Sequence, residues 1–284
     1  MPKAAVLGSP IAHSLSPVLH RAGYAACGLR GWRYTRHEVT ADQLVGFVAA
    51  LGPQWRGLSL TMPLKEAALG LASTVSAVAA RAGAVNTLVR RDDGGWDGTN
   101  TDVAGIVAAL SSALSCDGPA RPVRAARVLG SGATARSAVL ALAALGVEQV
   151  SIAARNEATS AELLELASEL GMGAQPGPLR HWVDHPGQLV ISTLPPAASA
   201  ATAQVLRRAT PQALAGVTLL DVVYAGWPTP LALSAAAAGA HVISGLDMLV
   251  HQAAAQFVLF TGVEPDVSAM FAAGRAALAR EGSR

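Results

Sequence analysis

Cysteine is scarce in this sequence of 284 residues, which has only Cys27 and Cys116, far apart along the chain. Two such residues exclude a disulfide framework and a zinc site built from cysteines, and they fit a reducing compartment. Aromatic residues make up 4% of the chain and charged residues 14%, whereas 51% is hydrophobic. This composition excludes an intrinsically disordered protein, because it provides enough apolar material for one large or two ordinary packed domains.

An excess of one charge sign is also missing, since 21 Lys and Arg residues stand against 19 Asp and Glu residues. The sequence therefore lacks the basic field that nucleic-acid binding needs, and we expect no nucleic-acid partner. No apolar run reaches the ~20 residues that cross a bilayer, and the first residues lack the apolar length of a signal peptide. We expect a cytoplasmic protein with no membrane partner. The seven histidines show no metal-ligand spacing, so we predict no metal site.

Short apolar runs alternate with helical segments in both halves of the chain. Strands are predicted at 3–7 and 58–61 in the first half and at 126–129 and 149–153 in the second. Such alternation is typical of an α/β fold with a mostly parallel sheet and helices on both faces. The stretch 115–122 is rich in Gly, Pro and small polar residues, which predicts a linker between two βαβ series.

Local patterns also predict where some elements begin. Ser16 stands before a proline, which favours a helix start with Ser16 as its N-cap. Thr40 with Gln43 three residues later is typical of a capping box and predicts a helix that begins there. A further helix is expected at 75–82. The Asp-Asp-Gly-Gly sequence at 92–95 is typical of a hairpin turn.

A glycine-rich turn follows the predicted strand 126–129 and leads into a helix. Glycines in such a turn let the backbone approach a pyrophosphate, while the helix N-terminus supplies N–H donors and a positive dipole. The setting of strand, turn, helix and strand favours a dinucleotide site over a turn made only for packing. The turn consists of Gly130, Ser131, Gly132, Ala133 and Thr134.

The end of the next strand indicates which dinucleotide binds. An Asp or Glu there would bind the ribose 2′-hydroxyl of NAD, but this sequence has Ala154 and Arg155. An arginine at this place can pair with a 2′-phosphate, so the predicted cofactor is NADP. A solvated arginine after a strand is the alternative interpretation.

Polar side chains also follow the predicted strands of the first half. The hydroxyls of Ser14 and Ser16 can hold a carboxylate or a polyol, and Thr61 lies at the next strand end. Lys65 can act as a general acid and base, with Asp102 as its carboxylate partner. Turn residues, helix caps and a surface lysine remain alternatives for these positions.

Taken together, these segments resemble the shikimate dehydrogenase family. They keep the family order and spacing from residue 8 to residue 253. The matching segments are Gly8 to His20, Thr61 to Lys65, Ala84 to Thr87, Asn100 to Asp102, the glycine turn, Asp221 to Tyr224, Thr229 to Leu231 and Gly245 to Ala253.

The resemblance implies a role for each matching residue. Shikimate would be bound by Ser14, Ser16, Thr61, Lys65, Asn86, Asp102, Tyr224 and Gln252. NADP would be bound by Gly130, Ser131, Gly132, Ala133, Thr134, Arg155, Val222, Gly245 and Met248. Lys65 would be the catalytic acid and base, paired with Asp102 as the second catalytic residue. The implied reaction is the reversible reduction of 3-dehydroshikimate to shikimate by NADPH in chorismate biosynthesis.

The resemblance also implies a two-domain α/β fold. Residues 1–103 together with 246–284 would form a substrate-binding catalytic domain, which the C-terminal helices complete. Residues 104–245 would form a Rossmann-like NADP-binding domain. The protein would be a monomer or a homodimer.

This sequence departs from the usual family pattern at a few positions. Ser59 stands where the family usually has Asn, Ala133 replaces a common second glycine, and the end of the second strand reads Ala-Arg-Asn at 154–156. A quinate/shikimate or aminoshikimate dehydrogenase is one alternative. A non-catalytic sensor of the metabolite and nucleotide is another, although the presence of Lys65 and Asp102 argues against it.

Overall fold

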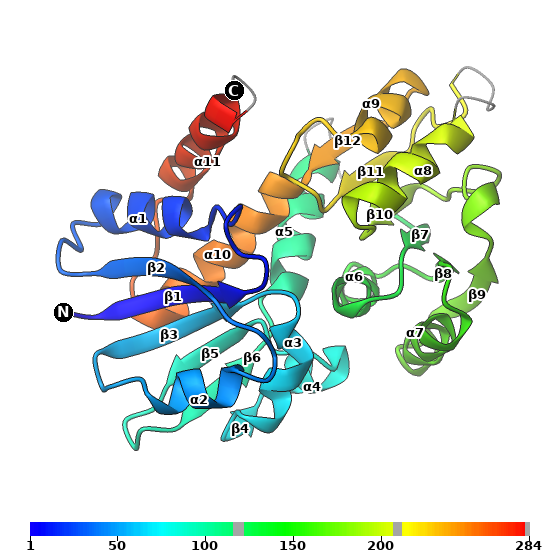
Figure 1. Cartoon of the computed structure of the whole chain (residues 1–284). Coiled ribbons are helices and arrows are strands. Elements are labelled where there is room, and N and C mark those ends of the chain that lie inside the picture. The colour runs from blue at the N-terminus through cyan, green and yellow to red at the C-terminus, as the bar shows by residue number, and fades with distance from the viewer. Residues whose placement is uncertain (116–121, 207–211, 282–284) are drawn as a thin grey trace. The chain divides into compact units, whose positions relative to one another are not determined.

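The computed structural model describes residues 1–115, 122–206 and 212–281 (Figure 1). The chain divides into two compact units. Unit 1 comprises Met1–Gly105 and Leu249–Arg284, and unit 2 comprises Ile106–Met248. Most of the predicted linker, residues 116–121, lies outside the described residues. The two unit boundaries fall inside helices α5 (Asp102–Leu114) and α10 (Gly245–Thr261).

Unit 1 is built on a six-stranded sheet with the order β2-β1-β3-β5-β6-β4. Its strands are β1 (Lys3–Gly8), β2 (Arg33–Glu38), β3 (Trp55–Leu60), β4 (Thr74–Val75), β5 (Thr87–Arg90) and β6 (Trp96–Thr99). Strands β1, β2 and β3 run parallel, whereas β5 is antiparallel to both β3 and β6. Strand β4 pairs with β6 in parallel, so three of the five pairings are parallel and the sheet is mostly parallel, as predicted. Only β5 of these six strands runs the other way, because the tight turn at 92–95 joins it to β6 as a hairpin, and a hairpin joins antiparallel strands.

Helices cover both faces of this sheet. The helices of this unit are α1 (Ser16–Ala26), α2 (Leu44–Ala49), α3 (Leu64–Ala67) with the short 3₁₀ turn η1 (Ala68–Gly70), α4 (Ala77–Ala82), the first turn of α5 up to Gly105, α10 from Leu249 onward, and α11 (Val267–Glu281). Alternate residues of β1 point to opposite faces. Ala5 and Leu7 pack with α2, α3 and α4, whereas Ala4 and Val6 pack with α1 and with Phe257 of α10. Helix α11 packs on α1, so the C-terminal segment completes the unit that the N-terminal segment begins (Figure 1).

Three predicted helix starts are shifted in the structure. Leu15 is the N-cap of α1, and Ser16 is already helical, with its N–H directed at Ser14 Oγ at 3.4 Å. The Thr40 N–H donates to Gln43 Oε1 at 3.1 Å, which is half of the predicted capping box. The Thr40 hydroxyl instead donates to a neighbouring aspartate, and helix α2 begins only at Leu44.

The third shift concerns the helix expected at 75–82. Val75 pairs with β6 as part of β4, because the backbone there continues the sheet. Ser76 is the N-cap, and its hydroxyl accepts the Ala79 N–H at 3.3 Å. The helix therefore begins at Ala77.

Unit 2 is built on a second six-stranded sheet, with the order β12-β11-β10-β7-β8-β9 and parallel pairing throughout. The strands are β7 (Ala125–Leu129), β8 (Gln149–Ala153), β9 (Gly173–Gly177), β10 (Leu189–Ser192), β11 (Thr218–Asp221) and β12 (His241–Ser244). From β7 the chain winds outward through β8 and β9, and then returns to wind in the opposite direction from β10. This doubly wound order is that of a Rossmann-like fold, which confirms the predicted α/β class.

The helices of unit 2 also lie on both faces of its sheet. They are α6 (Ala133–Ala144), α7 (Glu157–Glu169), the 3₁₀ turn η2 (Leu179–His181), α8 (Pro196–Leu206) and α9 (Pro230–Ala237). One face packs Leu129 and Val190 against α8, α9 and the fully buried Trp182. The sequence did not predict β9, whose residues Gly173–Gly177 include a proline and two glycines. Such a strand is tolerated because β9 lies at the edge of the sheet.

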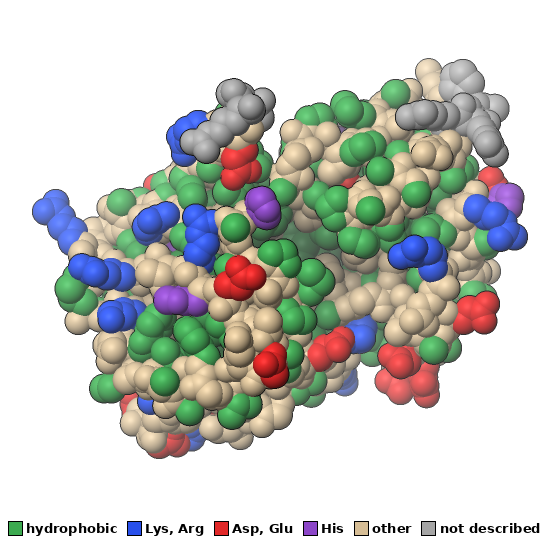
Figure 2. Space-filling view, viewed as in Figure 1, with side chains coloured by type: hydrophobic (Ala, Val, Ile, Leu, Met, Phe, Trp, Pro, Cys, Tyr) green, Lys and Arg blue, Asp and Glu red, His purple; other side chains and the backbone are tan. Residues whose placement is uncertain are grey.

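The surface of unit 1 carries a local group of cations. Figure 2 shows Lys and Arg side chains over α1 and β2, where Arg21, Arg33 and Arg36 are exposed. Charges on an edge strand such as β2 hinder pairing with a second sheet. In the described ranges, no helix combines the length and the apolarity needed to cross a membrane.

Candidate functional site

The carboxyl ends of β1 and β3 approach each other closely. Thr61 N–H donates to Leu7 O at 3.0 Å. A Cβ on Gly8 would lie 2.4 Å from Thr61 Cγ2 and 2.9 Å from Met62 O. Only a glycine permits this contact, which places Thr61 against the end of the strand that leads to Ser14 and Ser16. The Ser14 side chain is half-buried, and Ser16 is buried.

Lys65 and Asp102 form an ion pair in unit 1. Lys65 Nζ donates to Asp102 Oδ2 at 2.5 Å, and the two side chains are 15% and 6% exposed. Asp102 is the first helical residue of α5, and its N–H donates to Asn100 Oδ1 at 3.0 Å. The Asn100 side chain thus satisfies an N–H at the helix start, while the Asp102 carboxylate bonds to Lys65.

Asn86 donates a hydrogen bond to the second oxygen of this carboxylate. Asn86 Nδ2 donates to Asp102 Oδ1 at 2.8 Å and to Thr101 Oγ1 at 3.0 Å. Asn86 Oδ1 accepts the Thr101 N–H at 2.8 Å and the Thr87 hydroxyl at 2.7 Å. These four contacts determine which way the amide points, so Asn86 always presents a donor to Asp102.

The C-terminal segment contributes Gln252 from α10. Thr101 Oγ1 contacts Gln252 Oε1 at 3.5 Å, and Gln252 Nε2 donates to Leu249 O at 2.9 Å. The structure thus brings together Lys65, Asn86, Asp102 and Gln252, which come from four separate segments of the sequence. Tyr224 belongs to unit 2, in the segment after β11. Its part in substrate binding stays a prediction.

The sequence analysis assigned no role to several buried polar residues around this group. They are Tyr34, Ser59, Thr87, Thr101 and Gln256, each at most 5% exposed. One signal was available, because Gln256 stands four residues after Gln252 and hence on the same face of an apolar helix. Two amides on one such face indicate a shared polar environment.

In unit 2 the glycine turn combines a close backbone approach with an uncovered helix start. Gly130 has φ +109°, and a Cβ there would lie 2.5 Å from Thr193 Oγ1. Gly132 is the N-cap of α6, and a Cβ on it would meet nothing within 4 Å. One glycine therefore makes the close turn possible, and the other leaves the helix N-terminus open to a ligand. Ala133 and Thr134 are the first residues of α6.

Two further contacts organise the surroundings of the turn. Ser131 Oγ lies 2.7 Å from Thr159 Oγ1, which ties the turn to α7. A Cβ on Gly245 would lie only 2.2 Å from Val222 O, so the start of α10 touches the segment after β11. Met248 lies one helical turn further along and is buried. The structure thus brings Val222 and Gly245 together, as it does the residues of the glycine turn.

The segment after β11 is anchored by a buried carboxyl group. Asp221 accepts the Thr229 hydroxyl at 2.7 Å and the Val223 N–H at 3.3 Å. Burial raises the pKa of Asp221. These bonds hold both ends of the segment that carries Val222 and Tyr224.

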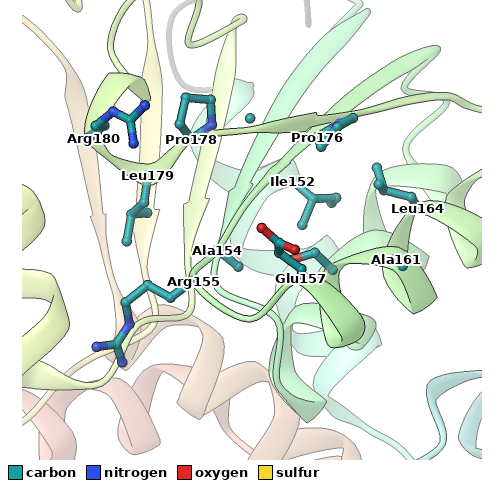
Figure 3. Close-up of a pocket in the computed structure, with 12 residues that line it drawn as sticks. Ile152, Ala154, Arg155, Glu157, Ala161, Leu164, Pro176, Pro178, Leu179 and Arg180 are labelled. Carbon is teal, nitrogen blue, oxygen red and sulfur yellow. The ribbon is translucent and has the colours of Figure 1, made fainter.

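Arg155 borders a cavity of about 630 Å³ at the ends of β8 and β9. Figure 3 shows Arg155 and Arg180 extending from different elements at its margin, with the Glu157 carboxylate on the side of Ala154 and Ala161. Ile152, Leu164 and Pro176 form its apolar wall. The exposed guanidinium of Arg155 fits a 2′-phosphate, because arginine presents a fork of donors to phosphate oxygens. In the part of the chain that the structure describes, no three His, Cys, Asp or Glu side chains are grouped to hold a metal ion.

Comparisons with known proteins agree with one another. Residues 6–88 match the family model of the shikimate dehydrogenase substrate binding domain, and residues 245–273 match that of the shikimate 5′-dehydrogenase C-terminal domain. The chain is 36% identical to the shikimate dehydrogenase (NADP(+)) of Methylobacterium radiotolerans, with 94% of each chain covered.

Solved structures show the same likeness. The shikimate dehydrogenase of Mycobacterium tuberculosis is 42% identical, with a TM-score of 0.85, covering 98% of this chain and 100% of that chain. The Thermus thermophilus enzyme in complex with NADP(H) and shikimate is 34% identical, with a TM-score of 0.81 and the same coverage. A quinate dehydrogenase from Corynebacterium glutamicum in complex with NAD reaches a TM-score of 0.82 at 27% identity, covering 97% of this chain and 99% of that chain. The identity over nearly the whole length shows that this chain belongs to the shikimate dehydrogenase family.

Proposed function

We propose that this chain catalyses the reversible reduction of 3-dehydroshikimate to shikimate with NADPH, and that Lys65 and Asp102 are its catalytic residues. Family membership makes the chain an NADP-dependent oxidoreductase that acts on a CH–OH group. The observation that carries the residue assignment is the buried pair of Lys65 Nζ and Asp102 Oδ2 at 2.5 Å.

Lys65 has the position and chemistry of a general acid and base. Reduction of a ketone places negative charge on the carbonyl oxygen, and a proton must reach that oxygen. The Lys65 ammonium donates this proton, and in the oxidative direction the resulting amine takes it back. Asp102 accepts one N–H bond of the ammonium group and so orients it, which leaves the other two donors of Lys65 for the substrate oxygen. When bound, NADPH supplies the hydride.

The other polar residues of unit 1 orient the substrate. Ser14 and Ser16 bind its carboxylate together with Tyr224, and Thr61, Asn86, Asp102 and Gln252 hold its ring hydroxyls. Gln252 donates one Nε2–H to Leu249 O, and its second N–H is available to a substrate hydroxyl. Fixing several hydroxyls at once places the reacting carbon, which is how an enzyme lowers the entropy cost of the reaction.

Unit 2 holds NADP in this proposal. Gly130, Ser131, Gly132, Ala133 and Thr134 receive the pyrophosphate, Arg155 pairs with the 2′-phosphate, and Val222, Gly245 and Met248 line the nicotinamide end. The open N-terminus of α6 and the exposed Arg155 support this assignment. The protein acts as a monomer or homodimer in the cytoplasm.

Initial rates at 340 nm with shikimate and NADP, on the wild type and on Lys65→Ala, test the proposal. We expect turnover in the wild type and a loss of about 10²–10⁴-fold in kcat in the variant, the usual contribution of a general acid and base. Arg56→Ala is the matched control, because Arg56 is an exposed cation of the same unit. Equal kcat in wild type and Lys65→Ala would refute the role of Lys65.

Quinate and NAD provide the second arm of the experiment. The fold does not separate the two substrates, since a quinate dehydrogenase shares it with a TM-score of 0.82. We expect shikimate with NADP to give the highest kcat/KM of the four combinations. A preference for quinate or for NAD would keep the fold and replace the proposed substrate or cofactor. Nucleotide binding without any turnover would favour the non-catalytic sensor.

A further inference from the structure

A chain of hydrogen bonds inside unit 1 leads from β2 toward the Lys65–Asp102 pair. Tyr34 Oη donates to Ser59 Oγ at 2.6 Å, and Ser59 Oγ donates to Gln256 Oε1 at 2.6 Å. Gln256 Nε2 donates to Thr87 Oγ1 at 2.9 Å and to the backbone oxygen of Asn86 at 3.3 Å. Gln256 thus joins β2 and β3 to the start of β5, where it contacts Thr87 and the preceding residue Asn86.

The same chain continues from Thr87 to the carboxylate. Thr87 Oγ1 donates to Asn86 Oδ1 at 2.7 Å, and Asn86 Nδ2 donates to Asp102 Oδ1 at 2.8 Å. Each hydroxyl has a single hydrogen, and an ionised carboxylate can only accept. The donor direction is therefore the same at every step, from Tyr34 to Asp102.

The residues of this hydrogen-bond chain are buried, so the loss of any one bond is costly. Tyr34, Ser59, Asn86, Thr87 and Gln256 are each at most 3% exposed. Water cannot replace a lost partner at such positions, so a removed donor leaves an unsatisfied acceptor. Burial also raises the pKa of the Tyr34 hydroxyl, which keeps it protonated as the first donor. Bonds aligned in one direction polarise one another, so each of them strengthens the next.

We infer that Gln256 is a positioning residue for the Lys65–Asp102 pair, with Ser59 and Tyr34 supporting it. Gln256 holds the Asn86 backbone oxygen and the Thr87 hydroxyl, and these two groups keep Asn86 Nδ2 directed at Asp102. Gln256 is not among the proposed substrate contacts, so it acts through Asn86 and Asp102. The inference rests on the proposed function, because it takes Lys65 and Asp102 as the catalytic pair.

Gln256→Met tests the inference, because methionine keeps the length of the side chain and removes both polar ends. We expect kcat to fall about tenfold, since small misplacements of catalytic groups cost up to about 10²-fold. KM for shikimate should stay within about twofold, because the substrate contacts remain and only the chemical step is impaired. Ser59→Ala should lower kcat less than Gln256→Met, and Tyr34→Phe less again, in the order of their distance from Asp102 along the chain.

Tyr24→Phe is the matched control for Tyr34→Phe. Both tyrosines lie in the same aromatic cluster and are at most 4% exposed. The Tyr24 hydroxyl has no hydrogen-bond partner among the described residues. Removing it should therefore leave kcat unchanged, whereas removing the Tyr34 hydroxyl should not. Equal kcat values in the two variants would mean that the chain has only a structural role, which overturns the inference.

Hydrogen exchange of the Asn86 side-chain amide, followed by NMR on asparagine-labelled protein, gives a readout that does not depend on turnover. We expect slow exchange in the wild type and exchange at least about tenfold faster in Gln256→Met, because Asn86 loses its supports. Wild-type kcat and wild-type exchange in folded Gln256→Met would overturn the inference.

Two features of the design keep the outcomes distinct. If Gln256→Met does not fold, Ser59→Ala and Tyr34→Phe decide the inference by the same two readouts. If Lys65→Ala keeps its activity, the proposed function fails whatever Gln256 does. If Lys65→Ala is inactive and the three chain variants are unaffected, the inference alone fails.

Discussion

The two units have six-stranded sheets of similar size but use their polar groups differently. In unit 1, buried side chains such as Asn86, Asp102 and Gln256 bond mainly to one another at the strand ends. In unit 2, the proposed ligand turn offers backbone groups, shaped by Gly130 and Gly132. In the proposed function, unit 1 therefore binds its substrate through side chains, which can discriminate between hydroxyls. Unit 2 receives the pyrophosphate through backbone N–H groups, which depend on space and conformation, and uses a side chain only at Arg155.

Asp102→Asn should have the largest effect on kcat, because it changes the residue that bonds to both Lys65 and Asn86 in unit 1. The ion pair with Lys65 is lost, and the new amide can present a donor to Asn86, which itself donates there. We expect kcat to fall about 10²–10⁴-fold, in the range of general acid–base catalysis. Steady-state rates at 340 nm measure the effect.

Asp93→Asn is the control for that prediction. Asp93 pairs with Arg91 at 3.0 Å in the same unit, but the two side chains are 61% and 36% exposed. An exposed pair contributes little to stability, so kcat and Tm should both stay close to wild type. A comparable loss of kcat in Asp93→Asn would show that ion pairing in general, not the Lys65–Asp102 site, supports the activity.

The second prediction concerns pH and the aromatic cluster of unit 1. Burial lowers the pKa of His20 from 6.5 to about 3. The imidazole ring stacks on the ring of Tyr34, and the two ring centroids are 4.0 Å apart. Between those two pH values the unfolded chain binds a proton that the folded chain does not. The contribution to stability is therefore complete above pH 6.5 and is lost as pH falls toward 3, by about 1.4 kcal/mol per pH unit.

Urea unfolding at pH 7, 6 and 5 measures this slope for the wild type and for His20→Phe. Phenylalanine keeps an aromatic ring in the stack and cannot titrate, so the slope of the variant should be smaller by the amount due to His20. Parallel stability curves for the two proteins would contradict the assignment of the pH dependence to His20.

A pair of glycine variants tests the proposed ligand turn of unit 2. Gly130→Ala places a Cβ 2.5 Å from Thr193 Oγ1 at φ +109°. We expect it to lower the free energy of unfolding by about 1–3 kcal/mol, because an L side chain is strained at positive φ. Gly132→Ala meets no atom within 4 Å, so it should leave stability nearly unchanged.

Gly132→Ala should affect NADPH binding, although it leaves stability nearly unchanged. Gly132→Ala projects into the open space at the N-terminus of α6, so it should weaken NADPH binding without a loss of stability. Thermal unfolding and quenching of NADPH fluorescence separate the two effects. Unchanged NADPH affinity in Gly132→Ala would show that the ligand does not approach the turn at this residue.

Arg155→Ala should have the smallest effect of the series, because it removes one exposed cation. We expect the Kd for NADPH to rise about tenfold, equivalent to about 1.4 kcal/mol, and the Kd for NADH to stay the same. Arg180→Ala is the control from the opposite margin of the same cavity. An equal rise for NADH would mean that Arg155 does not contact the 2′-phosphate.

Much of the fold follows from patterns within short stretches. Apolar runs identified β1 and β7, the turn at 92–95 identified the β5–β6 hairpin, and glycines identified the turn before α6. Helix starts were less accurate. At residue 40, for example, the threonine hydroxyl bonds to a nearby aspartate instead of capping a helix. Strand β9 was not predicted, because a segment that contains Pro and Gly forms a strand only when it pairs with the edge of a neighbouring strand, here β8.

The candidate site divides in the same way. Its glycine turn, Lys65, Asp102 and Arg155 stand in segments whose order and spacing can be read along the chain. How Asp102 is held cannot be read there, since the Asn100 side chain accepts its N–H and Asn86 donates to one carboxylate oxygen.

Local sequence patterns are sufficient for the α/β class, the glycine turn and the residue types available for the chemistry, because each depends on neighbours within a few positions. The pairing of β5 with β3 and the chain of donors that ends on Asp102 depend on the tertiary structure. Ser59 and Gln256 are 197 residues apart in the sequence yet share a bond of 2.6 Å. Such a contact forms only because α10 packs on the first sheet, and no local pattern specifies which buried polar groups then meet.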